Sequence, residues 1–178
     1  MFKHTLRKTW STLAVMMFTG FTVSAFAHSP APKNAPKKTG ASEVMKLQVK
    51  SGVSLDDAAE SMRLRANALN MKLVTELPLS SQVEAITGKP QRRVTIFQFC
   101  DALTAKDLIE LNIDFAVYMP CRIALIEDAK GQAWLVMMDI DVDAVAREKR
   151  VPAELKKRIE AVRNTLIDIM QAGAKGEL

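Results

Sequence analysis

The segment Arg92–Cys100 has the residue pattern of a β-strand, and it constrains the fold more than any other part of the chain. Successive side chains of a strand point to opposite faces of its sheet. One face of this strand should therefore carry Val94, Ile96, Gln98 and Cys100, and the other Arg93, Thr95, Phe97 and Phe99.

Strand and helix patterns alternate along the rest of the chain body. Further strands are predicted at Val44–Val49, Met71–Glu76, Phe115–Glu127 and Ala133–Met138, and helices at Ser54–Asn70, Ser81–Gly88 and Thr104–Leu111. Pro120 should break the long strand, bulge it or place it at an edge. The sequence thus predicts an α+β fold, as one small domain over residues 43–145. Its sheet should be mostly antiparallel, with helices packed on one face and the main elements in the order β-α-β-β-α-β-β.

A C-terminal helix is predicted at residues 150–173, where apolar residues recur at spacings of four and three. Pro152 suits the first helical position, and Leu155, Ile159 and Val162 begin the apolar stripe. The stripe is too short for an independent coiled coil. It either docks on the chain's own core or forms a dimer contact.

Residues 1–27 have the composition of a secretory signal peptide. Basic residues precede an apolar run at Trp10–Val23, and Ala25 and Ala27 form the small-x-small pattern at which such peptides are cleaved. The run is shorter than the ~20 residues that a spanning helix needs, and no later segment is long and apolar enough to span. The mature protein is therefore expected to begin at His28, to be periplasmic or secreted, and to have no transmembrane segment after signal cleavage.

Residues 28–42 are predicted to be a flexible linker, because they are rich in Pro and Lys and lack apolar periodicity. The formal net charge is +5, and removal of the signal peptide lowers it to +2. Three of the remaining basic residues are linker lysines, so the predicted domain has no basic excess. Nucleic acid is not expected as a partner, since its binding needs a basic face on the fold.

The mature chain has no histidine inside the predicted domain. His4 lies in the signal peptide and His28 in the linker. Serine and cysteine catalysis that depends on a histidine base is therefore excluded, as is a histidine-based zinc site. No glycine-rich phosphate loop is present either. A non-enzymatic protein is favoured.

Two cysteines, Cys100 and Cys121, supply the soft-ligand chemistry of the predicted domain, and three interpretations of them remain open. A disulfide suits an oxidising compartment, and closing a loop of this length is worth about 3 kcal/mol. Two buried free thiols would pack as small apolar groups. A working site would bind copper(I) or haem iron, with Met119 as a further ligand, or would handle sulfur. Arg122 could then lower a thiol pKa or bind an anionic oxo-sulfur species.

Tyr118, Met119, Cys121 and Arg122 are adjacent candidates for the wall of a binding pocket, together with Trp134. Aromatic residues combine a large apolar surface with a polar group, which suits a pocket. The same property suits the protein core or a dimer contact for Tyr118 and Trp134.

The order of these motifs resembles the domain-of-unknown-function 302 family. The similar segments are Lys72–Glu76, Arg92–Asp101, Met119–Arg122 and the hairpin Ile123–Gly131. Pro120-Cys121-Arg122 matches the family motif in full, whereas the Cys-Asn-Pro-like turn of the family is here Cys100-Asp101-Ala102. The resemblance covers residues 44–140 and leaves the C-terminal helix outside. It implies a small α+β fold, often a homodimer, without an established activity.

Three functional hypotheses follow. The favoured one is a homodimeric, non-enzymatic periplasmic binding or accessory protein whose ligand and cofactor are unknown. The alternative is a thiol-based redox, sulfur-handling or soft-metal protein, with copper or haem, that uses Cys100 and Cys121. The third is a structural partner of a periplasmic protein complex, joined through the C-terminal helix.

Overall fold

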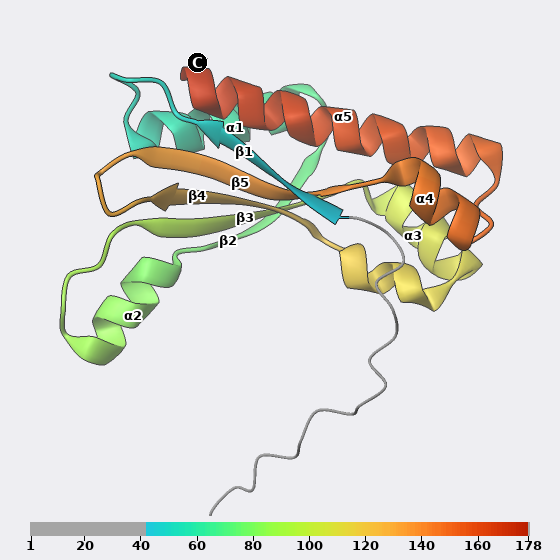
Figure 1. Cartoon of the computed structure of the whole chain (residues 1–178), viewed down its shortest axis with the longest axis horizontal. Helices are drawn as coiled ribbons and strands as arrows, with labels where there is room; N and C mark the ends of the chain where they lie inside the picture. The colour runs from blue at the N-terminus through green and yellow to red at the C-terminus, as the bar shows by residue number, and fades with distance from the viewer. Residues whose placement is uncertain (1–41, 178) are drawn as a thin grey trace, which may run out of the picture. The chain divides into compact units, whose positions relative to one another are not determined.

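Five strands form one sheet, and helices connect most of them (Figure 1). The computed structural model describes residues 42–177, so the predicted signal peptide and nearly all of the predicted linker lie outside the described residues. The elements in chain order are β1 Ser42–Gln48, α1 Leu55–Ala68, β2 Lys72–Leu77, α2 Leu79–Thr87, β3 Val94–Cys100, α3 Ala102–Leu111, the 3-10 helix η1 Ile113–Tyr118, β4 Cys121–Glu127, β5 Ala133–Ile140, α4 Val142–Glu148 and α5 Ala153–Lys175.

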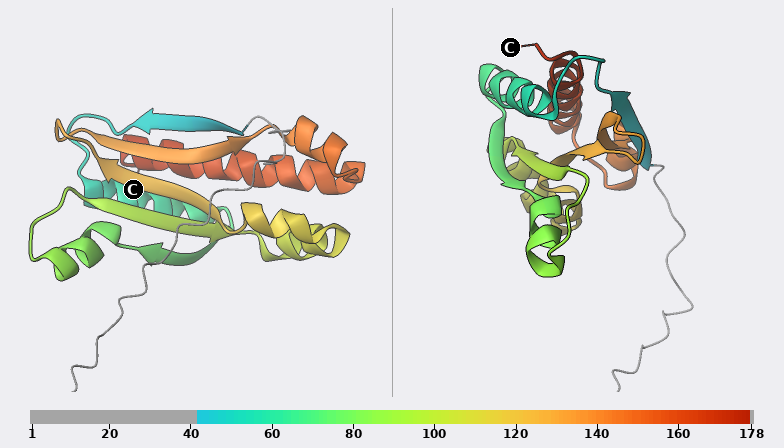
Figure 2. Two further views of the ribbon diagram at one scale, coloured as in Figure 1. Left: turned by 60° about the horizontal axis from the view of Figure 1, so that its bottom comes forward. Right: turned by 90° about the vertical axis from the view of Figure 1, so that its left-hand side faces the viewer.

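The strands lie in the order β1-β5-β4-β3-β2, and every neighbouring pair is antiparallel. Helices α1 and α5 lie side by side along one face of this sheet, whereas α3, η1 and α4 gather at one end of it (Figure 2). The predicted α+β class is confirmed, with its mostly antiparallel sheet, packed helices and added C-terminal helix.

The alternation along β3 determines which side chains enter the main core. Thr95, Phe97 and Phe99, which the pattern places on one face, are buried, while the residues between them are only partly buried. Pairing with β4 places Phe97 opposite Ile123, on the face that α1 and α5 cover. The fully buried members of this main core are Val49, Ala58, Ala59, Met62, Ala66, Phe97, Phe99, Ile123, Leu125, Leu135, Ile169 and Met170.

Of the two capping boxes predicted at helix starts, the one at Ser54 is confirmed and the one at Ser81 is not. The capping box at the start of α1 is present, because Ser54 accepts the Asp57 N–H and the Asp57 carboxylate accepts the Ser54 N–H. The capping box predicted at Ser81 is wrong, since α2 begins at Leu79 without a side-chain cap. The neighbouring Ser80 hydroxyl instead accepts the Val94 N–H at 3.2 Å and so ties α2 to the start of β3.

The strand predicted at Phe115–Glu127 is half wrong, because its first residues form η1 and β4 begins only at Cys121. Asn112 initiates the 3-10 turn by accepting the Asp114 N–H at 2.9 Å. Phe115 is then buried against Tyr118, with ring centroids 6.3 Å apart. The peptide before Pro120 is cis. The break expected at this proline therefore separates a helical turn from a strand.

The predicted C-terminal helix forms as α5 and docks on the chain's own core. Leu166, Ile169 and Met170 on this helix are buried in the main core. Its N-terminal part contributes Ile159 to a second, smaller core at the end of the sheet, whose buried members are Leu108, Phe115, Val142, Val145 and Ile159. Within residues 42–177, no helix has both the length and the apolar character needed to cross a membrane.

Candidate binding cavity

The sheet splits at the end that faces the second core. β5 stays paired with β1 as far as the Ser42–Ile140 pair, and β4 stays paired with β3 as far as Phe99–Cys121. Pairing between β4 and β5, however, ends at Ile123–Met137, although both strands continue beyond it. The two halves of the sheet therefore separate before their ends, and a gap lies between them.

A cavity of about 480 Å³ lies at this gap, between the main core and the second core. Its lining is predominantly apolar and comes from the strands, from α3 and η1, and from α4 and α5. The lining residues are Val44, Ile96, Cys100, Asp101, Thr104, Ala105, Leu108, Phe115, Tyr118, Met119, Pro120, Cys121, Arg122, Ala124, Val136, Met137, Met138, Ile140, Val145, Ile159, Val162, Arg163 and Leu166. The volume is within the range of about 300–1,000 Å³ that small-molecule sites occupy.

Both cysteines line this cavity, Cys100 from the end of β3 and Cys121 from the start of β4. They are free thiols, and no disulfide joins them. Burial raises the pKa of Cys121 to about 11, with a further contribution from Cys100. Burial, together with the Asp101 carboxylate, also raises the pKa of Cys100. Both thiols are therefore protonated at neutral pH, and the thiolate, which is the nucleophile and metal ligand, is disfavoured.

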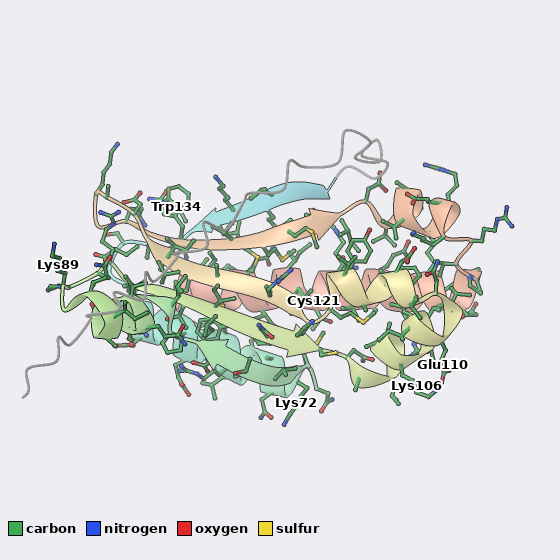
Figure 3. The ribbon with its side chains drawn as sticks, turned by 90° about the horizontal axis from the view of Figure 1, so that it is seen from below. Lys72, Lys89, Lys106, Glu110, Cys121 and Trp134 are labelled. Carbon is green, nitrogen blue, oxygen red and sulfur yellow. The ribbon has the colours of Figure 1, made fainter. Side chains whose placement is uncertain are left out.

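Of the other predicted pocket residues, Tyr118, Met119 and Arg122 line the cavity, but Trp134 does not. Trp134 lies near the hairpin at the opposite end of β5, away from Cys121 (Figure 3). Its indole N–H donates to the Asp128 carboxylate at 3.0 Å. Trp134 therefore supports the turn between β4 and β5 and does not contribute to the cavity wall.

Several cavity residues come from helices that the sequence patterns do not connect with a site. Leu108 on α3, Val145 on α4 and Ile159 on α5 form the wall opposite the sheet. Phe115 belongs to η1, in the segment predicted to be a strand. The apolar stripe of α5 predicted that Ile159 would be buried, but not that it would border a cavity.

No group of three or more His, Cys, Asp or Glu side chains in residues 42–177 is arranged to hold a metal ion. Cys100, Cys121 and Met119, the ligands predicted for a soft metal, nonetheless all line the cavity, as do Met137 and Met138. Thiolate and thioether ligands suit soft cations such as copper(I).

The sequence profile described as Domain of unknown function DUF302 matches residues 46–173. The chain belongs to this family. The match includes most of α5, so the C-terminal helix lies inside the DUF302 region. The motif resemblance, which ends at residue 140, wrongly left this helix outside.

The crystal structure of an uncharacterized conserved protein DUF302 from Bacillus stearothermophilus has a similar fold, with a TM-score of 0.57 at 12% sequence identity. The similarity covers 72% of this chain and 96% of that chain. At this identity it supports the DUF302 fold alone. No functionally curated protein matches the chain.

Proposed function

We propose that this DUF302 protein is a non-enzymatic binding or accessory protein that holds a small apolar molecule in the cavity at the split end of its sheet. The observation behind this proposal is the cavity itself. It has the volume of a small-molecule site and an apolar lining contributed by eight elements of the fold. Concave, mostly apolar sites with a few polar groups are typical of ligand binding.

The chemistry of the lining supports binding without catalysis. Both thiols are held in their protonated form by burial. The fold has no histidine to act as a general base, since both histidines precede Ser42. Asp101 accepts the Thr104 N–H at 2.7 Å and so serves as the N-terminal cap of α3. A general base near neutral pH needs a group whose pKa is tuned to that range, and the raised pKa values of the two thiols move them away from it.

The proposal also covers where the protein is located and how it assembles. The signal-peptide pattern of residues 1–27 supports export to the periplasm or beyond. The family resemblance supports a homodimer, and a further periplasmic protein is the other candidate partner. Because the apolar stripe of α5 is buried on the chain's own core, a partner could reach only the outer side of this helix or another surface of the fold.

Blocking the cavity tests the proposal. We expect the neutral apolar dye Nile red to bind the wild-type protein with increased fluorescence, because the dye is transferred from water into an apolar site. Ala105 on α3 lines the cavity and Ala102 on the same helix is exposed outside it, so Ala105→Phe should weaken dye binding at least tenfold and Ala102→Phe should not. Equal binding by both variants and the wild type would contradict the proposed site. Native mass spectrometry of protein isolated from its own cells would report the natural ligand and the oligomer.

The thiol-based alternative is favoured by one observation, the presence of both cysteines and of Met119, Met137 and Met138 in the lining of one cavity. An anaerobic copper(I) titration against a competing chelator tests it. If the site is a copper site, Cys121→Ala and Met119→Leu should each lower the affinity by at least tenfold. Equal copper affinity in the two variants and the wild type would exclude this alternative and leave the apolar-ligand proposal intact.

A further inference from the structure

The cavity carries one positive charge that no other described residue neutralises. Arg122 lines the cavity from β4, and its side chain is exposed. Within residues 42–177 the guanidinium forms no ion pair and no side-chain hydrogen bond. Val44 and Met138 of the lining are exposed as well, whereas Leu108, Phe115 and Ile159 are buried, so Arg122 lies at the opening of the cavity.

The other two charged residues of the lining already have partners. Arg163 makes a bidentate ion pair with Asp139, with N–O distances of 2.5 Å and 2.6 Å. Asp101 accepts the Thr104 N–H and lies at the positive end of α3, where a carboxylate is stabilised. The charge of Arg122 is therefore the one left for a ligand among the described lining residues.

The backbone at Arg122 marks the start of the gap. Glu127 donates its N–H to Arg93, toward β3, and successive residues of an antiparallel strand bond to opposite neighbours. Arg122 lies an odd number of residues from Glu127, so its backbone groups point toward β5. Because Ile123–Met137 is the last pair between β4 and β5, Arg122 lies where the two strands begin to separate.

We infer that the ligand of this cavity is an amphipathic anion. Its alkyl or aryl body would occupy the apolar interior, and its carboxylate, sulfonate or phosphate head would pair with the guanidinium of Arg122. Charge-assisted hydrogen bonds from arginine to such anions are among the strongest in proteins. The inference rests on the proposed function, because it names the class of molecule that the same cavity holds.

Three probes with the same alkyl chain separate the contribution of the head from that of the body. Decanoate is an anion, decanol is neutral and decylamine is a cation. We expect decanoate to displace Nile red at the lowest concentration and decylamine at the highest. Added salt should weaken the binding of decanoate and leave that of decanol unchanged, since screening affects only charged partners.

Substitution of Arg122 tests the role of this side chain directly. Arg122→Gln should weaken decanoate binding about fivefold to tenfold, the effect of a charged hydrogen bond at a partly screened site. Arg122→Lys should retain part of the preference, because it keeps the charge but loses the planar fork. Decanol should bind all of these proteins equally. Arg92→Gln is the matched control, since Arg92 is exposed, precedes β3 and does not line the cavity.

The outcomes distinguish the two proposals. If Nile red and decanol bind but decanoate has no advantage, or if Arg122→Gln leaves that advantage intact, the anion inference is overturned and the apolar cavity stands. If none of the probes binds the wild-type protein, the proposed function fails, and the inference fails with it.

Discussion

The two hydrophobic cores of this protein differ in how completely they are filled. The main core lies where all five strands are paired, and there α5 approaches α1 so closely that a Cβ atom on Gly173 would lie 2.6 Å from Met62 Cγ. The second core lies beyond the split between β4 and β5, and a cavity of about 480 Å³ separates it from the first. One sheet thus supports a tightly packed region and an open one.

The difference follows from strand pairing. Where the ladder is continuous, the side chains on one face form an even surface that two helices can cover with few voids. Where β5 leaves β4 after Met137, that surface ends, and residues of α3, η1 and α4 line a cavity. The open end is the one to which we assign the proposed ligand, and the difference in packing can be tested by substitution in each core.

Replacing a buried phenylalanine by alanine in each core should give the largest difference in the free energy of unfolding. Phe97→Ala in the main core should lower the free energy of unfolding by about 3–5 kcal/mol, because a fully buried ring is lost from a region that cannot collapse. Phe115→Ala in the second core should cost less, about 1–3 kcal/mol, because Phe115 already borders a void and makes fewer contacts to lose. Urea unfolding measures both values. Equal losses would show that the two cores are packed alike.

The raised pKa of Cys121 predicts a loss of stability at alkaline pH. The pKa of this thiol is about 11 in the folded protein, whereas the unfolded chain ionises it around the ordinary cysteine value of 9.0. A group whose pKa is raised by folding stabilises the fold below its unfolded pKa, and this contribution is lost as pH rises through the folded pKa. Between pH 8 and pH 11 the wild-type protein should therefore lose up to about 2 kcal/mol relative to Cys121→Ala.

The stability difference between the wild type and Cys121→Ala can be measured by urea unfolding in reductant at several pH values. Other titrating groups are common to both proteins and cancel in the comparison. Parallel pH profiles for the wild type and Cys121→Ala would show that burial does not raise this pKa.

The local parts of the fold are predictable from the sequence, and the features that make the cavity are not. The alternation in β3 and the capping box at Ser54 depend on residues close together in the chain, and both are confirmed. The helical turn η1 also has a local signal in Asn112, but the apolar pattern around Phe115 fits a strand equally well. Only contact with the second core decides between them.

The candidate site shows the same limit. The motif around Cys121 and Arg122 correctly selects cavity residues, because they are neighbours at the start of one strand. Trp134 is predicted as a pocket residue only because it is aromatic, and it lies at the other end of β5. The split of the sheet depends on the separate registers of β1 with β5 and of β3 with β4. No single segment of the sequence contains that information.

Adding one methyl group to the main core should have a smaller effect than removing a ring, but a clear one. In Gly173→Ala the new Cβ would lie 3.1 Å from the Ala58 carbonyl oxygen, which is backbone and cannot move aside. Overpacking costs about 1–3 kcal/mol, and the better helix propensity of alanine returns about 1 kcal/mol. The expected net loss is about 1 kcal/mol in urea unfolding. The exposed Gln171→Ala on the same helix is the control, and a Gly173→Ala protein more stable than the wild type would contradict close packing here.

Adding carbon atoms at the open end should change stability least of all. Ala124 lies on β4 between Ile96 and Val136 and lines the cavity, so Ala124→Val extends into empty space and suits a strand. The free energy of unfolding should stay within about 0.5 kcal/mol of the wild-type value, while Nile red binding weakens because the cavity is smaller. A loss of stability as large as that of Gly173→Ala would mean that the cavity is filled by side chains in solution. Unchanged stability with weaker dye binding would show that the space left by the split sheet is kept for a ligand and not for packing.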